Sequence, residues 1–455
     1  MSSLLKSMSK ATAQQTAQRD ELQRIKQAVE DAAFESDLAQ IYEGVSENLE
    51  EMLTTSTDIS AQSDELMKNN ALTGTLTDLV DSTLDTYGKD GMTEQAAELM
   101  RVSVESILRS AQLFDVIPVS LLVPSFESGM TRAEYSVEAE EKKQGMLARM
   151  LAWIAEAFSA MWTSIKSFFQ KFAGNVDGVK KYAETVQTKV NGLAVTSATK
   201  EVNLGNIGIY LADNNGTIVH PDKAISAIMA DFQTFSQKWD GSFGNILKIE
   251  IPSGVMDEAS QQKFIQQLSA AVGNIIHSGS PSINKLNFIP SHQISIVPGQ
   301  DKENSMIGST LKIEMVSKVK DAKMGALTKG DLTAGINAAL AGLVGIGKIQ
   351  TKVDEWDKYA AKIQTFSKNA LTALKREEKS AEKRFTSEEI AAATRTYKTL
   401  VAANSIMISG WVKTVPQVLT GIKASVRVID MAVGRKDKNA EGSPDKFDPT
   451  VVATQ

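Results

Sequence analysis

The chain has 455 residues, of which 42% are hydrophobic and 23% are charged. That length allows two to four domains, and that composition is ordinary for a protein that buries a core. Cysteine is absent, which excludes disulfide frameworks, thiolate zinc sites and cysteine nucleophiles. The three histidines, His220, His277 and His292, lie far apart, with no second histidine or carboxylate at ligand spacing. We therefore expect neither a metal site nor a cofactor.

Charge is distributed unevenly along the chain. Residues 1–138 hold 10 Lys and Arg against 24 Asp and Glu, a net charge of −14. The remaining 317 residues hold 39 against 31, a net charge of +8, and the overall value of −6 hides this division. Such a difference suggests a detachable or separately partnered segment, although a solvated acidic helical region would show the same balance.

The first third of the chain is predicted to be helical. Its first 15 residues lack the continuous apolar stretch of a secretory signal, so we expect synthesis in the cytoplasm. From residue 12 to about 110, apolar residues recur at three- and four-residue steps, which predicts a helical hairpin or bundle. Pro118, Pro124 and Gly129 then mark a break, and residues 134–143 form a charged connector. We call residues 1–138 the acidic leader.

Residues 145–172 are the most distinctive segment. They predict a helix with one wide apolar face and a polar opposite face. The apolar face includes Trp153, Phe158, Trp162, Ile165 and Phe169. One hypothesis is an interfacial helix that inserts this face into lipid or into a partner groove, and the other is an ordinary core helix. With a following helix at 176–190, this segment makes up a predicted unit of residues 139–195.

Residues 196–322 are predicted to form a small mixed α+β module with a mostly antiparallel sheet. Strands are expected at 202–211 and 217–220, joined by a turn at Asn215-Gly216, and at 246–251, 293–297 and 310–316. Amphipathic helices are expected at 223–239 and 257–277.

The C-terminal part returns to a helical pattern. Helices at 332–375, 387–408 and 415–433 predict a bundle over residues 323–433, and the polar residues 434–455 predict a disordered tail. The fold class is therefore α+β and predominantly helical.

No catalytic residue set can be assembled from the sequence. Gly342 to Lys348 has the GxxxxGK spacing of a phosphate-binding loop, but Ile349 stands where a Ser or Thr hydroxyl must meet magnesium. The preceding residues are also helical in pattern where a strand is required. Glycines that permit close helix packing are the better interpretation, and we expect no enzyme.

One short pattern concerns processing of the protein. Tripeptides of a small residue, any residue and Glu occur eight times in the first 141 residues and twice later. One of them, Ser136-Val137-Glu138, lies in the charged connector and is followed by Ala139. Ser125-Phe126-Glu127 is a competing site.

This organisation resembles the internal head proteins of giant tailed bacteriophages of the phiKZ type. The resemblance rests on the acidic helical leader, the Ser136-Val137-Glu138 step and the basic remainder. It implies a structural precursor in the prohead core that a phage protease cuts after small-x-Glu sites. The trimmed protein would stay inside the head with the genome, and some such proteins are ejected with it. The implied partners are other head proteins, the protease, packaged DNA through weak contacts, and further copies of the chain.

The charge distribution provides a physical reason for cleavage after Glu138. An acidic leader repels DNA and masks a basic surface, and its removal changes the net charge from −6 to +8. A cut after Glu138 also places residues 145–172 near a new N-terminus, so we expect membrane or partner contact only after cleavage. The alternative class is a membrane-active helical protein, such as a pore-forming toxin or a secretion translocator, which would use the same amphipathic helices.

Overall fold

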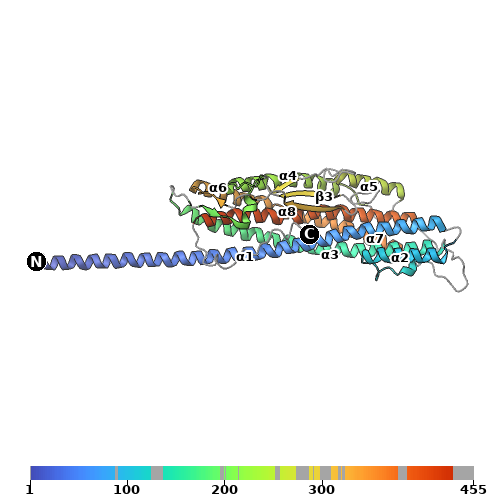
Figure 1. Ribbon diagram of the computed structural model, residues 1–455, viewed down its shortest axis with the longest axis horizontal. Helices are drawn as coiled ribbons and strands as arrows, with labels where there is room; N and C mark the ends of the chain where they lie inside the picture. Colours follow the sequence, from blue (N-terminus) through green and yellow to red (C-terminus); the bar gives the residue numbers. More distant parts are fainter. Residues whose placement is uncertain are drawn as a thin grey trace.

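The computed structural model describes residues 2–87, 91–123, 137–194, 199, 201–213, 215–251, 257–272, 286–289, 292–297, 309–315, 319, 323–377 and 387–433. These residues form an elongated helical bundle with a small sheet on one side (Figure 1). The predicted fold class, predominantly helical α+β, is confirmed.

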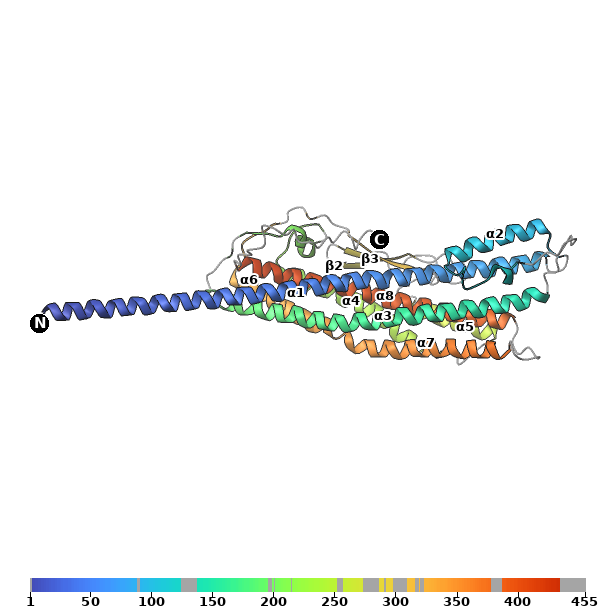
Figure 2. The same cartoon turned by 90° about the horizontal axis from the view of Figure 1, so that it is seen from below.

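Three long helices run side by side through the body: α1 (Ser2–Tyr87), α3 (Val137–Asn191) and α8 (Ser387–Ala432). The N-terminal part of α1 extends beyond the rest of the molecule, as two perpendicular views show (Figures 1 and 2). The short helix α2 (Glu94–Ser110) lies beside the opposite end of α1 and is followed by the 3-10 turn η1 (Val119–Leu121).

The acidic leader shares the core of the molecule. Its apolar side chains on α1 are buried against α3 and α8 and belong to one continuous hydrophobic cluster. The buried hydrophobic residues of α1 are Leu38, Val45, Leu49, Met52, Leu53, Ile59, Leu66, Met67, Leu76 and Val80. In the intact chain, the leader therefore contributes to the stability of the bundle.

Helix α8 is the centre of the bundle. It packs against α1, α3, α4 (Pro221–Leu247), α5 (Glu258–Val272), α6 (Lys329–Gly347) and α7 (Gln350–Glu377). Almost every described side chain from Ala392 onward is buried, because other elements surround this helix, and its buried side chains are both apolar and polar. The sequence predicted two helices here, which is wrong, because α8 continues through Pro416.

The α+β module contains two small antiparallel sheets. One has the order β2 (Leu286–Ile289), β3 (His292–Val297) and β4 (Thr310–Met315) and contacts α4 and α8. The other pairs β1 (Val202–Asn203) with β5 (Lys323–Met324). The predicted strands at 293–297 and 310–316 are confirmed as β3 and β4, which pair from His292 with Met315 to Val297 with Thr310.

Three other strand predictions are wrong. Residues 217–220 form no strand, and only an isolated bridge pairs Ile218 with Ala212. Residues 205–211 form the 3-10 helix η2 (Gly205–Leu211), and only the first residues of the predicted strand are extended. The predicted strand at 246–251 is also wrong, because α4 continues to Leu247 and no strand follows over 248–251. The helical spacing of Trp239, Phe243 and Ile246, which are all buried, explains why the helix continues. The predicted turn is present, with the Asp213 N–H donating to Thr217 O at 2.8 Å and Gly216 at φ 75°.

The predicted helix at 332–375 is two helices, α6 and α7, separated at Lys348 and Ile349. Helix α6 begins at a capping box between Thr328 and Asp331. The GxxxxGK glycines lie inside α6 and permit close packing. A Cβ on Gly342 would meet Ile422 of α8 at 3.2 Å and Met229 of α4 at 3.3 Å. The close-packing interpretation of these glycines is therefore confirmed.

One described segment, Lys329–Thr372, is long and apolar enough to cross a membrane by length and composition. Core helices pass the same test, and α6 within this segment packs against α3, α4 and α8.

Candidate functional site

The predicted cleavage site lies at the start of α3. Val137 begins the helix, and Glu138 and Ala139 lie in its first turn. Ser136 and the competing site Ser125-Phe126-Glu127 lie outside the described residues. Cleavage at either site stays a prediction.

The aromatic face of residues 145–172 points into the core. Trp153 is half-buried, and Phe158, Trp162, Ile165 and Phe169 are buried. The Trp162 indole N–H donates to Asp357 Oδ1 of α7 at 2.8 Å, and Phe169 contacts Trp356 of α7 with ring centroids 5.3 Å apart. In the intact chain this segment is therefore a core helix, which was the second of the two hypotheses.

A polar seam joins α1 to α8. Ser63 and Ser409 share a hydrogen bond of 2.8 Å between their hydroxyls, and Lys413 Nζ lies 3.5 Å from Asp64 Oδ2. Lys413 also donates to the carbonyl of Leu311 in β4 at 2.6 Å. Burial lowers the pKa of Lys413 and raises the pKa of Asp64, although each group counteracts the shift in the other. Lys413 is largely buried, whereas the Asp64 side chain is partly exposed, so the pair lies at the edge of the core.

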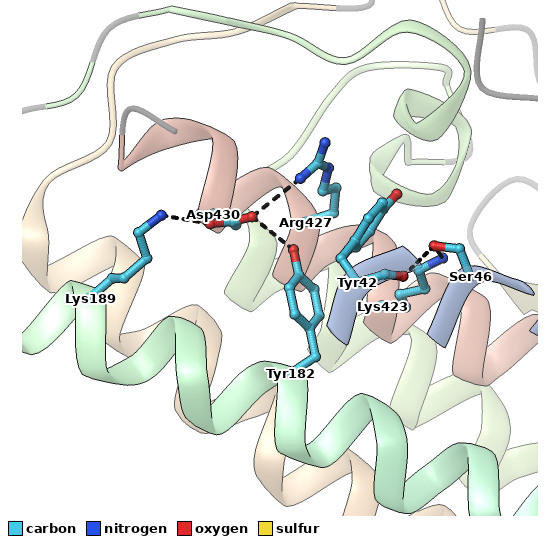
Figure 3. Close-up of polar contacts among 7 residues, drawn as sticks. All are labelled: Tyr42, Ser46, Tyr182, Lys189, Lys423, Arg427 and Asp430. Atoms are coloured by element: carbon cyan, nitrogen blue, oxygen red, sulfur yellow. Dashed lines mark hydrogen bonds and ion pairs between the residues drawn. The ribbon is translucent and has the colours of Figure 1, made fainter. Parts of the chain in front are cut away.

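A second polar cluster is centred on Asp430, near the end of α8 (Figure 3). The carboxylate is fully buried and accepts from three side chains. Tyr182 Oη of α3 lies at 3.0 Å, Lys189 Nζ of α3 at 3.1 Å and Arg427 Nη1 of α8 at 3.2 Å. Burial, followed by the negative charge of Asp430, holds the pKa of Tyr182 well above its ordinary value, so the phenol is a proton donor. The cluster fixes α3 against α8.

Tyr42 extends this cluster to α1 (Figure 3). The centroid of its ring lies 4.2 Å from the guanidinium carbon of Arg427 and 4.6 Å from Lys423 Nζ. The ring centroids of Tyr42 and Tyr182 are 5.4 Å apart. Ser46, one turn further along α1, accepts from Lys423 at 2.6 Å. Cations over an aromatic face are attracted by its quadrupole. We call Tyr42, Ser46, Tyr182, Lys189, Lys423, Arg427 and Asp430 the basic cluster.

The basic cluster has an excess of positive charge. It holds three basic side chains and one carboxylate, and Asp430 contacts two of those bases. Among the described residues, no three His, Asp or Glu side chains gather at a spacing that could hold a metal ion. The cluster is therefore suited to recognition of an anion or an acidic helix rather than of a cation.

The sequence predicted neither of the two polar sites at which α1 contacts α8. A signal was present in the sequence, because Lys413, Lys423 and Arg427 lie among uncharged residues in the second half of this helical segment. A basic residue inside a buried helix requires a partner from another element. The sequence does not specify which helix supplies that partner.

Together these features define an elongated helical protein whose charged and polar groups join its own long helices. The family model of phiKZ-like phage internal head proteins matches residues 2–223, which extend from α1 into the first turn of α4. Residues 2–223 are thus similar to this family, and the resemblance inferred from the sequence is confirmed. No curated protein and no solved structure gives a significant match. The family consists of structural proteins from inside a bacteriophage head, so the membrane-active alternative is not favoured.

Proposed function

We propose that this chain is a non-enzymatic internal head protein, made in the host cytoplasm, whose acidic leader is cut off after Glu138. The remainder stays in the head beside the packaged DNA and can be ejected with it. Other head proteins, the prohead protease and further copies of the chain are its proposed partners. This proposal rests on the family match, on the small-x-Glu pattern and on the way α1 covers basic side chains.

The observation that carries the proposal is the set of contacts between α1 and four basic residues of α3 and α8. Lys171 Nζ lies 2.6 Å from Glu51, and Lys413 lies 3.5 Å from Asp64. Lys423 and Arg427 lie over Tyr42. All four basic residues follow the proposed cut, and their partners precede it. Loss of the leader would therefore remove the acidic or aromatic partner of all four basic side chains, of which Lys171 is already exposed in the intact chain.

Basic side chains that have lost these partners would attract DNA. Each basic residue that neutralises a phosphate releases a condensed counterion, and the binding is independent of base sequence. The remainder has a net charge of +8, whereas the intact chain has −6. We therefore propose that the leader prevents premature contact with nucleic acid and that its loss permits it.

Removal of the leader also has a physical cost. The buried apolar side chains of α1 would leave matching apolar surface on α3 and α8 exposed to water. A single cut after Glu138 leaves α1 held by these contacts. Further small-x-Glu sites inside α1, at Glu30, Glu35 and Glu65, would divide it into shorter segments that each bury less surface. We propose that other head proteins or a second copy then cover the exposed face.

Membrane or partner contact through residues 145–172 requires a further step. Trp162 and Phe169 contact α7, which lies after the cut and is retained. Their exposure would require separation of α3 from α7 and not only loss of the leader. Membrane contact is therefore a secondary element of the proposal.

The decisive experiment is intact-mass and N-terminal peptide analysis of the protein taken from mature phage heads. A start at Ala139 supports the cut after Glu138, and a start at Ser128 supports the competing site. A start at Met1 or Ser2 with every leader peptide present would refute the processing. The matched variants are Glu138→Gln, expected to retain the leader, and Glu127→Gln, expected to be processed normally.

A further inference from the structure

A small cavity opens beside the basic cluster, between α1, η2 and α8. Its volume is about 100 Å³, and its polar lining comes from all three elements. The lining includes Tyr42 and Ser46 of α1, Tyr210 of η2, and Thr420, Lys423 and Arg427 of α8. A volume of this order holds a group of a few heavy atoms, because one water molecule occupies roughly 30 Å³ of liquid.

We propose that this cavity binds a single phosphate group. Two basic side chains and four hydroxyls line it. Three of the hydroxyls already donate their protons within the chain: Ser46 to Tyr42 O, Thr420 to Pro416 O and Tyr210 to Gln417 Oε1. The charged N–H donors that a tetrahedral oxyanion requires are therefore those of Lys423 and Arg427. The guanidinium of Arg427 provides paired N–H donors, and the ammonium of Lys423 provides a point charge. One acidic residue, Glu50, also lines the cavity, but it is exposed, so water screens its charge.

The two cations are held in place before any ligand arrives. Arg427 is bonded to Asp430 at 3.2 Å and lies against the Tyr42 ring, and Lys423 is bonded to Ser46 at 2.6 Å. Asp430 is itself fixed by Tyr182 and Lys189 (Figure 3). Groups that are already ordered lose little entropy on binding, so the arrangement favours affinity.

The cavity also has a consequence for the acidic leader. Tyr42 and Ser46 precede the proposed cut, whereas Tyr210, Lys423 and Arg427 follow it. A phosphate held between them binds the docked form of α1 more tightly than the undocked form. By linkage, it stabilises the docked form. Only this last consequence rests on the proposed function, and the binding itself does not.

The test uses the intact chain and inorganic phosphate. Titration calorimetry, with thermal unfolding at matched ionic strength in chloride, measures the binding. Phosphate is expected to bind with one site per chain and to raise the unfolding midpoint above that in chloride. The variant Lys423→Met should weaken binding at least tenfold, and Lys180→Met, which removes an exposed lysine of α3, should not change it. The variant Thr420→Val provides a second, uncharged change in the lining.

Two further arms distinguish the sources of the phosphate. A deoxynucleoside monophosphate and a short DNA duplex are titrated in the same way. If Lys423→Met weakens all three, the cavity accepts phosphates of the DNA backbone, and if it spares only the duplex, the ligand is a free phosphate or nucleotide. A phosphate effect no larger than that of chloride, or equal losses in the Lys423 and Lys180 variants, would overturn the proposal. These outcomes require no cleavage and so are independent of the processing proposal.

Discussion

Ser56 of α1 satisfies a carbonyl that Pro416 leaves free in α8. Pro416 has no N–H and cannot bond to the carbonyl of Val412, four residues earlier. The Ser56 hydroxyl donates to that carbonyl at 2.8 Å in the buried seam. The leader therefore repairs a break in the backbone hydrogen bonding of the central helix, and this explains how α8 continues through a proline.

The first prediction concerns this bond. Ser56→Ala leaves the Val412 carbonyl buried without a donor, so we expect a loss of about 1–3 kcal/mol in the free energy of unfolding. In a Pro416→Ala background the helix supplies its own N–H, and the same Ser56→Ala change should cost about 1 kcal/mol less. Chemical denaturation of the four proteins of this double-mutant cycle measures the coupling. Strict additivity would contradict the repair role.

The second prediction concerns the carboxylate of the basic cluster. Asp430→Asn removes the only negative charge of the cluster and leaves Lys189 and Arg427, both largely buried, without it. We expect a loss of roughly 3–5 kcal/mol in the free energy of unfolding. Tyr182→Phe removes one hydrogen bond to the same carboxylate and should cost about 1 kcal/mol. Equal costs for the two variants would show that the charge of Asp430 is not what holds the cluster.

The third prediction concerns close packing between α4 and α8. The Trp239 indole lies on Gly410 and donates to the carbonyl of Met407 at 3.1 Å. A Cβ at position 410 would lie 2.8 Å from Cζ2 of Trp239, so Gly410→Ala should cost about 1–3 kcal/mol or more.

The matched control is Gly241→Ala in α4. Gly241 is exposed, and a Cβ there meets nothing within 4 Å. This change should stabilise the protein by about 0.5–1 kcal/mol, because alanine is the better helix former. Thermal unfolding with tryptophan fluorescence separates the two outcomes, and a shift of the same sign in both would contradict the packing argument.

The fourth prediction concerns pH. Burial lowers the pKa of His292 in β3 to about 4, from an ordinary value of 6.5. Between these values the unfolded chain binds a proton that the folded chain does not, so stability falls as the pH decreases from about 6.5 to about 4. The loss attributable to His292 is roughly 3 kcal/mol at most.

Denaturation at pH 7 and pH 4.5 measures this loss. His292→Leu should reduce the pH dependence, whereas replacement of the exposed His220 by Gln should leave the contribution of His292 in place. An unchanged pH dependence in His292→Leu would contradict the assignment to His292.

The sequence by itself determined the helical character of the chain, two of the sheet strands and the division of charge. These properties depend on the spacing of apolar residues and on composition, which are local and additive. The small-x-Glu pattern and the charge division were also sufficient for the resemblance that the family match confirms.

Only the tertiary structure decided which elements the basic residues of α8 contact. Tyr42 and Arg427 are separated by 385 positions in the chain, and nothing in local periodicity pairs them. Likewise, residues 246–251 alternate like a strand, but the packing of Trp239, Phe243 and Ile246 keeps α4 helical to Leu247. The pattern of the aromatic face of α3 fits a core or an interface equally well, and its contact with α7 is what places it in the core. In each case the free energy comes from burial against a distant segment, which a local pattern does not specify.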